Sequence, residues 1–290
     1  MIKKYSVEAG FENGFITQVT KDICPNHKDV LKLQMFNGNC LNVMADLPAS
    51  SVDFVLADLP YEATQQNWDI VIPFDQLWAA YDRLCRPGAA IVLTATNPFA
   101  AQLITSKPNW FRYDLVWVKN KKTGFMNANR MPLRQHEHVL IFNKPGKRIY
   151  NAQKSAGHPP VHAVSARQNA VSAAVYGAMR KRTASGGSKE RYPTSVLNFP
   201  VVNNDDPARI HRNQKPVELL AYLVKTYSND GDNVLDNTMG SGSTAIACLY
   251  TGRNFVGIEQ DAAFFSGALK RIQLAAKTDY KKPLITIGKA

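Results

Sequence analysis

A glycine-rich segment of the sequence contains residue types that suit the binding of a nucleotide. Residues 234–245 read VLDNTMGSGSTA, in which Gly240, Gly242 and Ala245 follow the G-x-G-x-x-[G/A] spacing of nucleotide-binding folds. Glycines at these positions let the backbone turn tightly and come close to a ligand. An ordinary turn between a strand and a helix could contain the same glycines, so the spacing alone leaves both interpretations open.

Two carboxylates flank this turn and narrow the choice of ligand. Glu259 follows Gly240 by 19 residues, where a carboxylate can accept hydrogen bonds from both hydroxyls of a ribose. Asp236 lies directly before the turn, where it suits a cationic methionine group and would repel a pyrophosphate. A dinucleotide dehydrogenase and an S-adenosylmethionine enzyme both fit the glycines, and Asp236 favours the second.

A second group of residues suits the recognition of an exocyclic amine. Asp58-Leu59-Pro60-Tyr61 follows the apolar segment 52–57. The Asp58 carboxylate and the Leu59 carbonyl can each accept a hydrogen bond from the amine. Pro60 stiffens the turn, and Tyr61 offers a flat ring on which an extruded base can stack. On these four residues alone, a proline turn capped by Asp58 is the simpler interpretation.

These residues lie at the ends of apolar segments that alternate with amphipathic ones. Strands are predicted at 52–57, 89–93, 113–117, 138–142, 233–235 and 254–258. Helices are predicted over 74–85, 216–227, 244–250 and 262–276, the first ended by Pro87-Gly88. This alternation predicts an α/β fold, a mostly parallel twisted sheet with helices on both faces. Residues at the carboxyl ends of such strands line the ligand crevice.

The charge of the chain is concentrated in one quarter of its length. The 290 residues carry a net charge of +12, and residues 119–191 contain 15 Lys and Arg but only two acids, Glu137 and Glu190. Such a block is typical of contact with a polyanion, most often nucleic acid. Charge alone leaves open the alternative of a solvated, poorly ordered loop region.

The composition excludes several broad classes. With 45% hydrophobic and 20% charged residues, the chain is an ordinary globular protein rather than a disordered one. Neither a membrane span nor a signal peptide is predicted, because no long apolar segment is present. The four cysteines have no C-x-x-C spacing, which predicts reduced thiols in the cytosol. His136-Glu137-His138 lacks the spacing of zinc motifs, so no metal site is predicted.

Five segments, in order along the chain, resemble motifs of the β group of S-adenosylmethionine-dependent DNA amino-methyltransferases. Residues 58–61 resemble the [D/N/S]-P-P-[Y/F/W] tetrad of these enzymes, and residues 236–244 resemble their D-P-F-x-G-S-G-T-T loop. Residues 211–220, HRNQKPVELL, look like H-P-T-Q-K-P-x-E-L-L. Residues 255–259 resemble the strand that ends in the ribose-binding acid, and residues 37–41 resemble the G-D-x-L segment near the cofactor adenine.

The resemblance implies a Rossmann-like methyltransferase fold with S-adenosyl-L-methionine as cofactor. It makes Asp58, Leu59, Pro60 and Tyr61 the catalytic residues. The residues that it assigns to the cofactor are Asn39, Cys40, His211, Asn213, Lys215, Asp236, Asn237, Thr238, Gly240, Ser241, Gly242 and Glu259. Within this set, Lys215 and Asn213 are expected to bind the carboxylate of the cofactor.

The reaction implied by the resemblance is methylation of N6 of an adenine that is flipped out of duplex DNA. Asp58 and the Leu59 carbonyl would orient the amine for direct transfer of the methyl group. Asp58 favours adenine, because the cytosine-N4 enzymes of this group more often have serine there. A cytosine-N4 methyltransferase is the first alternative. An RNA or protein methyltransferase, an NAD-binding oxidoreductase and a DNA-binding protein without catalysis are the others.

Three positions depart from the family pattern. Leu59 stands where proline is usual, as in the D-L-P-Y tetrad of phage-type adenine methyltransferases. Thr238 replaces the phenylalanine of the cofactor loop, so the contact made by that ring must come from elsewhere. Asn39 replaces an aspartate and can still hydrogen-bond the adenine. None of these changes removes a catalytic group.

The basic quarter lies between the tetrad and the glycine turn, in the position of a target-recognition region. The resemblance therefore divides the chain into a catalytic half (30–144), a small basic inserted target-recognition region (145–194) and a cofactor-binding half (195–280). Residues 119–134 are predicted to form a flexible DNA-contacting loop. The residues predicted to bind DNA are Lys121, Lys122, Arg130, Arg134, Arg167, Arg180, Lys181, Arg182, Lys189 and Arg191.

The expected partner is double-stranded DNA, and the expected location is the cytoplasm, at the nucleoid, without membrane contact. A homodimer is expected because members of this group often dimerise. The sequence leaves open which DNA site is recognised and whether a cognate restriction enzyme exists.

Overall fold

The computed structural model describes residues 7–8, 14–19, 31–60, 71–160 and 186–277 of the chain. The chain divides into two compact units. The large unit is formed by Met1–Asn151 and Ser195–Thr286, and the small unit by Ala152–Thr194 and Ile287–Ala290. Five of the predicted site residues lie outside the described residues, namely Tyr61, Arg167, Arg180, Lys181 and Arg182.

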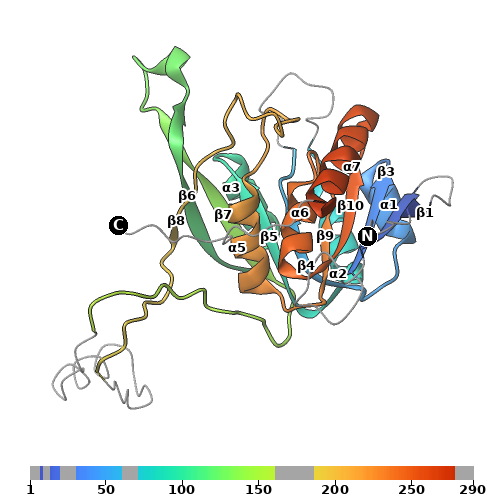
Figure 1. The fold of residues 1–290 in the computed structure, drawn as a ribbon, viewed down its shortest axis with the longest axis horizontal. Coiled ribbons are helices and arrows are strands. Elements are labelled where there is room, and N and C mark those ends of the chain that lie inside the picture. Colours follow the sequence, from blue (N-terminus) through green and yellow to red (C-terminus); the bar gives the residue numbers. More distant parts are fainter. Residues whose placement is uncertain (1–6, 9–13, 20–30, 61–70, 161–185, 278–290) are drawn as a thin grey trace. The chain divides into compact units, whose positions relative to one another are not determined.

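The described residues of the large unit contain one ten-stranded sheet (Figure 1). Its strands are β1 (Val7–Glu8), β2 (Gly14–Val19), β3 (Leu31–Asn37), β4 (Val52–Ala57), β5 (Cys85–Ala95), β6 (Phe111–Thr123), β7 (Arg134–Asn143), β8 (Val196–Asn198), β9 (Asn233–Asp236) and β10 (Asn254–Glu259). They lie in the order β1-β2-β3-β10-β9-β4-β5-β7-β6-β8. The strands from β3 to β5 in this order are parallel, and β7 and β6 follow as an antiparallel hairpin.

The central strands are short apolar segments that are buried on both faces. In β4, Val52, Phe54, Val55, Leu56 and Ala57 are all buried. Near-continuous burial of this kind is what a parallel sheet requires when helices cover both of its faces. The prediction of an α/β fold with a mostly parallel sheet is confirmed.

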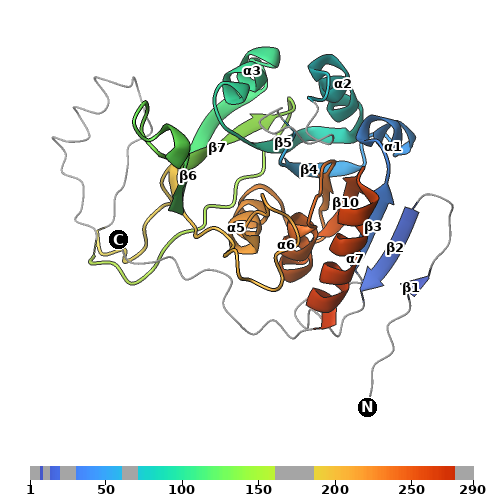
Figure 2. The ribbon, with the colours of Figure 1, turned by 90° about the horizontal axis from the view of Figure 1, so that it is seen from above.

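Helices pack on both faces of the sheet (Figure 2). One face carries α1 (Cys40–Asp46), α2 (Phe74–Leu84) and α3 (Phe99–Ser106), and the other carries α5 (Val217–Tyr227), α6 (Ser243–Thr251) and α7 (Ala262–Lys277). Two hydrophobic clusters result, one around Tyr81 and Leu103 and the other around Leu223 and Ile272. In the described part of the chain, no helix is long and apolar enough to cross a membrane.

All of the predicted strands and helices are present, but one boundary is wrong. Pro87-Gly88 was predicted to end a helix, whereas β5 already begins at Cys85 and passes through both residues. Gly88 has a φ of +85° and donates its N–H to the carbonyl of Pro145 at 3.1 Å, so the strand continues through this turn. Seven elements were not predicted, namely β1, β2, β3, α1, α3, β8 and a 3-10 turn at Phe125–Asn127.

The prediction of a loop over residues 119–134 is wrong for 119–123 and for Arg134, which lie in strands, whereas residues 124–133 connect the strands. β6 continues to Thr123, and this residue pairs with Arg134 at the start of β7. A 3-10 turn, η1 (Phe125–Asn127), lies at the end of the hairpin. The polar residues 119–123 show no apolar alternation, so the sequence did not indicate a strand there. Backbone pairing with β7 places them in one.

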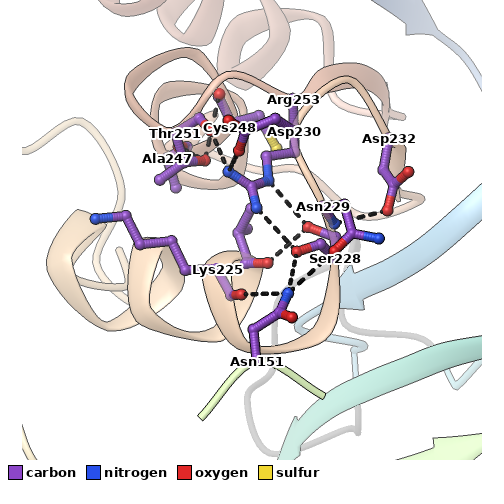
Figure 3. Close-up of polar contacts among 11 residues, drawn as sticks. Asn151, Lys225, Ser228, Asn229, Asp230, Asp232, Ala247, Cys248, Thr251 and Arg253 are labelled. Carbon is purple, nitrogen blue, oxygen red and sulfur yellow. Dashed lines mark hydrogen bonds and ion pairs between the residues drawn. The ribbon is translucent and has the colours of Figure 1, made fainter. Parts of the chain in front are cut away.

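A buried arginine joins several segments at the amino ends of the strands (Figure 3). Arg253, between α6 and β10, donates to the hydroxyl of Ser228 at 3.1 Å and to its carbonyl at 2.8 Å. Its guanidinium also pairs with Asp230 at 2.6 Å. Asn151 joins the same group, because its amide donates to the carbonyls of Lys225 (3.2 Å) and Ser228 (2.9 Å). The end of α5 is therefore fixed both to β10 and to the chain at Asn151.

The small unit is described at residues 152–160 and 186–194. Ser155 and Arg191 form an antiparallel bridge between these two segments, and Lys154 pairs with Glu190 at 2.9 Å. Arg191 also donates to the carbonyl of Pro159 at 2.5 Å. These contacts hold the two described segments side by side.

Candidate active site

Three acids lie along a crevice at the carboxyl ends of the parallel strands. Asp58 follows β4, Asp236 ends β9 and Glu259 ends β10. Because β4, β9 and β10 are neighbouring parallel strands, these ends meet at one edge of the sheet. A cavity of about 300 Å³ opens there. Its size is within the range of small-ligand sites.

Most of the residues predicted to form the site line this cavity. They are Asn39, Cys40, Asp58, Leu59, Pro60, His211, Asn213, Lys215, Asp236, Asn237, Thr238, Gly240, Ser241 and Glu259. Gly242 is not among the lining residues. It has a φ of +72°, and a Cβ there would lie 2.9 Å from Ile272 Cδ1. The glycine at this position therefore allows α6 to pack closely against α7.

The turn before α6 brings backbone up to the cavity at Gly240. This residue has a φ of +50°, and a Cβ built on it would meet no protein atom closer than the Thr238 carbonyl oxygen at 4.0 Å. Its N–H donates to Glu259 Oε2 at 2.8 Å. The N–H of Asp261 donates to Oε1 of the same carboxylate at 2.8 Å. Each oxygen of Glu259 keeps a lone pair for a further donor.

Asp236 is a buried carboxylate that receives two hydrogen bonds. The N–H of Thr238 donates to Oδ1 at 3.1 Å, and the hydroxyl of Thr244 donates to Oδ2 at 2.6 Å. Burial nevertheless raises the pKa of Asp236 to about 7. Burial also raises the pKa of Glu259. A cationic or hydrogen-bond-donating ligand would stabilise the ionised form of both acids.

Asn237 lines the cavity and connects it to α2 by a hydrogen bond. Its side-chain oxygen accepts a hydrogen bond from the buried Tyr81 hydroxyl at 2.6 Å. The Cys40 thiol lies against the same side chain, and burial raises the pKa of Cys40, which keeps it protonated. Asn237 and Cys40 therefore shape the cavity and bring no charge to it.

Two other residues assigned to the cofactor use part of their bonding capacity within the protein. Asn39 is the N-cap of α1, since its side-chain oxygen accepts the N–H groups of Leu41 (3.0 Å) and Asn42 (3.3 Å). The His211 ring packs edge to face on Phe264, with ring centroids 4.5 Å apart. Burial lowers the pKa of His211, so the ring is neutral at physiological pH.

Asp58 is held between two side-chain donors. The Thr94 hydroxyl donates to Oδ1 at 2.5 Å, and the Lys215 ammonium donates to Oδ2 at 2.5 Å. The Asp58 carbonyl accepts a hydrogen bond from the Thr238 hydroxyl at 3.1 Å. The side chain is 30% exposed, so one part of the carboxylate faces the cavity. Thr238 thus ties the tetrad to the glycine turn.

Lys215 also contacts a second carboxylate that the sequence had not placed in the site. Its ammonium lies 3.5 Å from Glu137 Oε2, and the ammonium of Lys119 binds the other oxygen of Glu137. The side chains of Lys215 and Glu137 are 10% and 11% exposed. Burial opposes ionisation of Glu137, but Lys215 and Lys119 hold its pKa below the usual range. Glu137 is therefore a charged anchor for Lys215.

Sequence reasoning missed Thr94 and Glu137, although each had a signal. Thr94 lies near the end of β5, directly beside the strand that carries the tetrad. Glu137 was one of the two acids in the basic quarter and directly precedes the apolar segment 138–142. The neighbouring histidines have ring centroids 5.4 Å apart. Among the described residues, no group of three His, Cys, Asp or Glu could hold a metal ion.

The basic residues predicted to bind DNA fall into two described groups. Lys121, Lys122, Arg130 and Arg134 are exposed on the β6–β7 hairpin of the large unit. Lys189 and Arg191 belong to the small unit. Arg191 donates to carbonyls of its own unit, while Lys189 is exposed. None of these residues lines the cavity.

The sheet order and the acids along the crevice define a Rossmann-like α/β enzyme. A family model for DNA methylases, N6_N4_Mtase, matches residues 52–270. The chain belongs to this DNA methylase family, so the prediction of a DNA methyltransferase is confirmed.

Individual relatives and solved structures agree with this assignment. The chain is 25% identical to the Type II methyltransferase M1.MboII of Moraxella bovis, over 79% of this chain and 92% of the relative. It is 26% identical to the DNA adenine methyltransferase YhdJ of Escherichia coli (strain K12), over 83% of each chain.

Two solved structures share the fold. The structure of the M1.HpyAVI–SAM complex superposes with a TM-score of 0.57 at 22% identity, covering 82% of this chain and 98% of the other. PvuII DNA methyltransferase (cytosine-N4-specific) gives a TM-score of 0.59 at 12% identity, covering 86% of this chain and 88% of the other.

Proposed function

We propose that this protein transfers a methyl group from S-adenosylmethionine to N6 of an adenine flipped out of duplex DNA. The observation that carries the proposal is the position of Asp58, a carboxylate fixed by Thr94 and Lys215 at one cavity whose other acids are Asp236 and Glu259. The adenine specificity named for the Escherichia coli relative and the cofactor named for the M1.HpyAVI structure support the choice of base and donor.

The cavity suits S-adenosylmethionine by its chemistry. When bound, S-adenosylmethionine supplies a methyl group that is activated by a positively charged sulfur. Asp236 would face the cationic methionine part, and the free lone pairs of Glu259 would accept the ribose hydroxyls. The open space above the Gly240 backbone would accept the ligand without a side-chain clash. Asn39 and His211 would border the adenine end of the cofactor.

Asp58 and the Leu59 carbonyl orient the target amine in this proposal. Thr94 and Lys215 each use one lone pair of the Asp58 carboxylate, so an oxygen can still accept an N–H of the adenine amine. Two acceptors, one for each N–H, turn the nitrogen lone pair toward the methyl group. The bound cofactor would supply the methyl group, and the N–H proton that the methylated amine loses would pass to solvent. Tyr61 is proposed to stack on the base.

The basic regions are proposed to bind the DNA around that adenine. Residues 145–194 would supply target recognition, with Lys189 and Arg191 as phosphate or base contacts. The exposed cations of the β6–β7 hairpin would contact the duplex beside the active site. In this division, residues 30–144 carry the catalytic tetrad and residues 195–280 carry the cofactor loop. We further propose a homodimer as the solution state.

The choice of base is tested by the methylated product. Expression in a host without DNA methylation, followed by enzymatic digestion and mass spectrometry, is expected to yield N6-methyladenine and no N4-methylcytosine. Modification-sensitive sequencing of the same DNA would locate the target site. N4-methylcytosine without N6-methyladenine would contradict the adenine assignment and favour the specificity of the PvuII enzyme. DNA from a host with an empty vector is the control.

Glu137→Gln tests whether the position of Asp58 depends on the charged network behind it. The amide keeps the size of the side chain but removes the charge that anchors Lys215. Since small displacements of a catalytic group can cost about 100-fold in rate, we expect kcat to fall roughly 10- to 100-fold. The rate is measured by single-turnover methyl transfer at saturating S-adenosylmethionine, because Lys215, which Glu137 anchors, is also expected to bind the cofactor carboxylate.

The matched control for this variant is Glu218→Gln, at an exposed position in the first turn of α5. It should retain wild-type kcat. Thermal melting of both variants shows whether the fold is intact. A Glu137→Gln enzyme with wild-type kcat would show that Asp58 is held in place without Glu137.

A further inference from the structure

We propose that the tip of the β6–β7 hairpin, residues 124–131, is an apolar wedge that enters duplex DNA next to the target adenine. This inference rests on the proposed function and adds the part of the chain that holds the DNA open. Three observations support it: the reach of the hairpin, the exposed apolar side chains at its tip, and the cations along its strands.

The hairpin projects from the edge of the sheet that carries the crevice. β5 ends at Ala95, which pairs with His138 of β7, and His138 pairs with Val116 of β6. β6 then continues from Val116 to Thr123, so the hairpin extends beyond β5 (Figure 1). Thr123 pairs with Arg134, which is only four residues beyond His138, because the register of β6 shifts between Val118 and Thr123. At about 3.3 Å per residue, the paired strands therefore reach roughly 13 Å past the end of β5, and the tip lies beyond them.

The direction of this projection follows from the strand pairing. β5 and β6 are both antiparallel to β7, so β6 runs in the same direction as β5 and β4. The carboxyl end of β6 therefore lies at the same end of the sheet as Asp58, which follows the carboxyl end of β4. Arg134, which pairs with Thr123 next to the tip, lines a second depression together with Val71, and Val71 also lines the active-site cavity.

The tip exposes large apolar side chains. Met126 is 100% exposed, Phe125 is 67% exposed and Met131 is 53% exposed. The backbone below them is ordered by its own hydrogen bonds, since Asn127 donates to Gly124 at 2.9 Å and Met131 donates to Asn127 at 3.0 Å. Apolar side chains grouped on an ordered, projecting turn are typical of a surface that contacts a partner.

The charges around the tip indicate what the partner is. Lys121 and Lys122 precede the tip, Arg130 lies within it and Arg134 follows it, and all four are exposed. The sequence has no acid from residue 119 to residue 136. Cations beside an apolar end match a duplex, in which phosphates flank a stack of bases. Because the tip lies at the same end of the sheet as the proposed methylation site, we infer that DNA is the anionic partner.

A wedge would offset the cost of moving the adenine out of the stack. Flipping a base loses stacking and pairing energy of a few kcal/mol. Apolar side chains inserted at a base step occupy the opened space and keep the flipped base from returning. Phe125 and Met126 have the size and exposure for this role, while Lys121 and Lys122 would hold the phosphates on either side.

The test uses the variant Phe125→Ser/Met126→Ser in the full chain. Both side chains are exposed, so the fold should be unaffected, as a thermal melt will show. The DNA carries 2-aminopurine at the methylated position, where its fluorescence rises when the base leaves the stack. On this DNA we expect a flipping signal at least about fivefold lower than wild type. The methylation rate needs a second duplex with adenine at that position, because 2-aminopurine has no N6 amine. On this second duplex we expect a single-turnover rate about tenfold lower, with the Kd for DNA changed less than about threefold.

A second substrate separates a wedge from a simple binding surface. When the target adenine is placed opposite an abasic site, flipping costs less, and the variant should recover to within about twofold of the wild-type rate. Leu274→Ser, at a 62% exposed position of α7, is the matched control and should behave as wild type on both substrates. Lys121→Ala/Lys122→Ala should weaken DNA binding and reduce its salt dependence by about two phosphate contacts.

Each outcome decides a different point. An equal flipping signal and an equal rate in Phe125→Ser/Met126→Ser would overturn the wedge, as would a lower rate that the abasic partner does not restore. If the wild-type protein itself methylates no adenine, the proposed function fails, whatever the hairpin does. A DNA affinity that Lys121→Ala/Lys122→Ala leaves unchanged would remove DNA as the partner of this surface.

Discussion

Asp58→Ala is expected to lower the rate of methyl transfer by about a thousandfold while S-adenosylmethionine still binds. The variant removes the carboxylate that Thr94 and Lys215 hold in position for the target amine. Loss of one preorganised polar group at a reacting centre costs about 100- to 1,000-fold, and misorientation of the amine adds to this. Single-turnover transfer to duplex DNA measures the rate, and calorimetry measures the cofactor affinity.

The fold should tolerate Asp58→Ala because Lys215 keeps Glu137 as a partner. Asp58→Asn retains one acceptor oxygen, so an intermediate loss of roughly 10- to 100-fold is expected. Asp82→Ala, which removes an exposed acid paired with Lys144 on the surface, is the matched control and should keep the wild-type rate. A rate within tenfold of wild type for Asp58→Ala would show that another group orients the amine.

Asp236→Asn is expected to change the pH dependence of both stability and cofactor binding. Burial raises the pKa of Asp236 from 3.8 to about 7, so between these values the folded protein keeps a proton that the unfolded chain has lost. The free energy of unfolding therefore falls as the pH rises from about 4 to about 7 and stays low above that. A shift of about three units corresponds to roughly 4 kcal/mol.

The stability measurement is a thermal melt of the ligand-free protein at pH 5 and pH 8. The amide of Asp236→Asn does not ionise, so the variant avoids the loss of stability that deprotonation of Asp236 causes. Its Tm should therefore exceed that of the wild type by about 5 °C or more at pH 8 and by much less at pH 5. Asp46→Asn, which removes an exposed acid of α1, should follow the wild type at both values. An Asp236→Asn protein with the wild-type pH dependence would show that Asp236 is already ionised in the folded state.

The affinity for S-adenosylmethionine should rise with pH, whereas the stability of the ligand-free protein falls. Ionised Asp236 attracts a cation, so the wild-type affinity for S-adenosylmethionine should rise about tenfold between pH 6 and pH 7.5 as the carboxylate loses its proton. Asp236→Asn should bind roughly 100-fold more weakly at pH 8 and show little change over this range. Calorimetric titration at the two pH values measures both effects.

The parts of the fold that the sequence predicted are those in which local pattern and tertiary packing agree. The apolar segment 52–57 forms β4, and the helix over 216–227 forms α5 with a change of one residue. The polar residues 119–123 behaved differently, because only pairing with β7 makes them a strand. α1 has only 7 residues, which is too short to show a clear helical pattern in the sequence. Its start is stabilised by the Asn39 cap.

The cavity was predicted better than the contacts within it. Spacing in the chain placed Asp236, Gly240 and Glu259 together, because they lie on consecutive turns of neighbouring strands. The pair of Lys215 and Asp58 joins residues 157 positions apart, and only the folded sheet brings Glu137 to the same ammonium. The glycine motif assigned Gly242 to the ligand. In the fold, the lack of a side chain at Gly242 is needed for the close packing of α6 against α7.

Residues 152–194 leave and re-enter the large unit at two residues, Asn151 and Ser195, that are both held by hydrogen bonds. Asn151 is bound to the end of α5, where Arg253 also joins β10, and on return the carbonyl of Ser195 accepts the N–H of Val116 at 2.8 Å. Asn151 is thus held through its side-chain amide and Ser195 through its backbone carbonyl, and neither contact uses a side chain of residues 152–194. Exchange of residues 152–194 is therefore expected to change the DNA contacts proposed for this segment while these hydrogen bonds of the large unit remain.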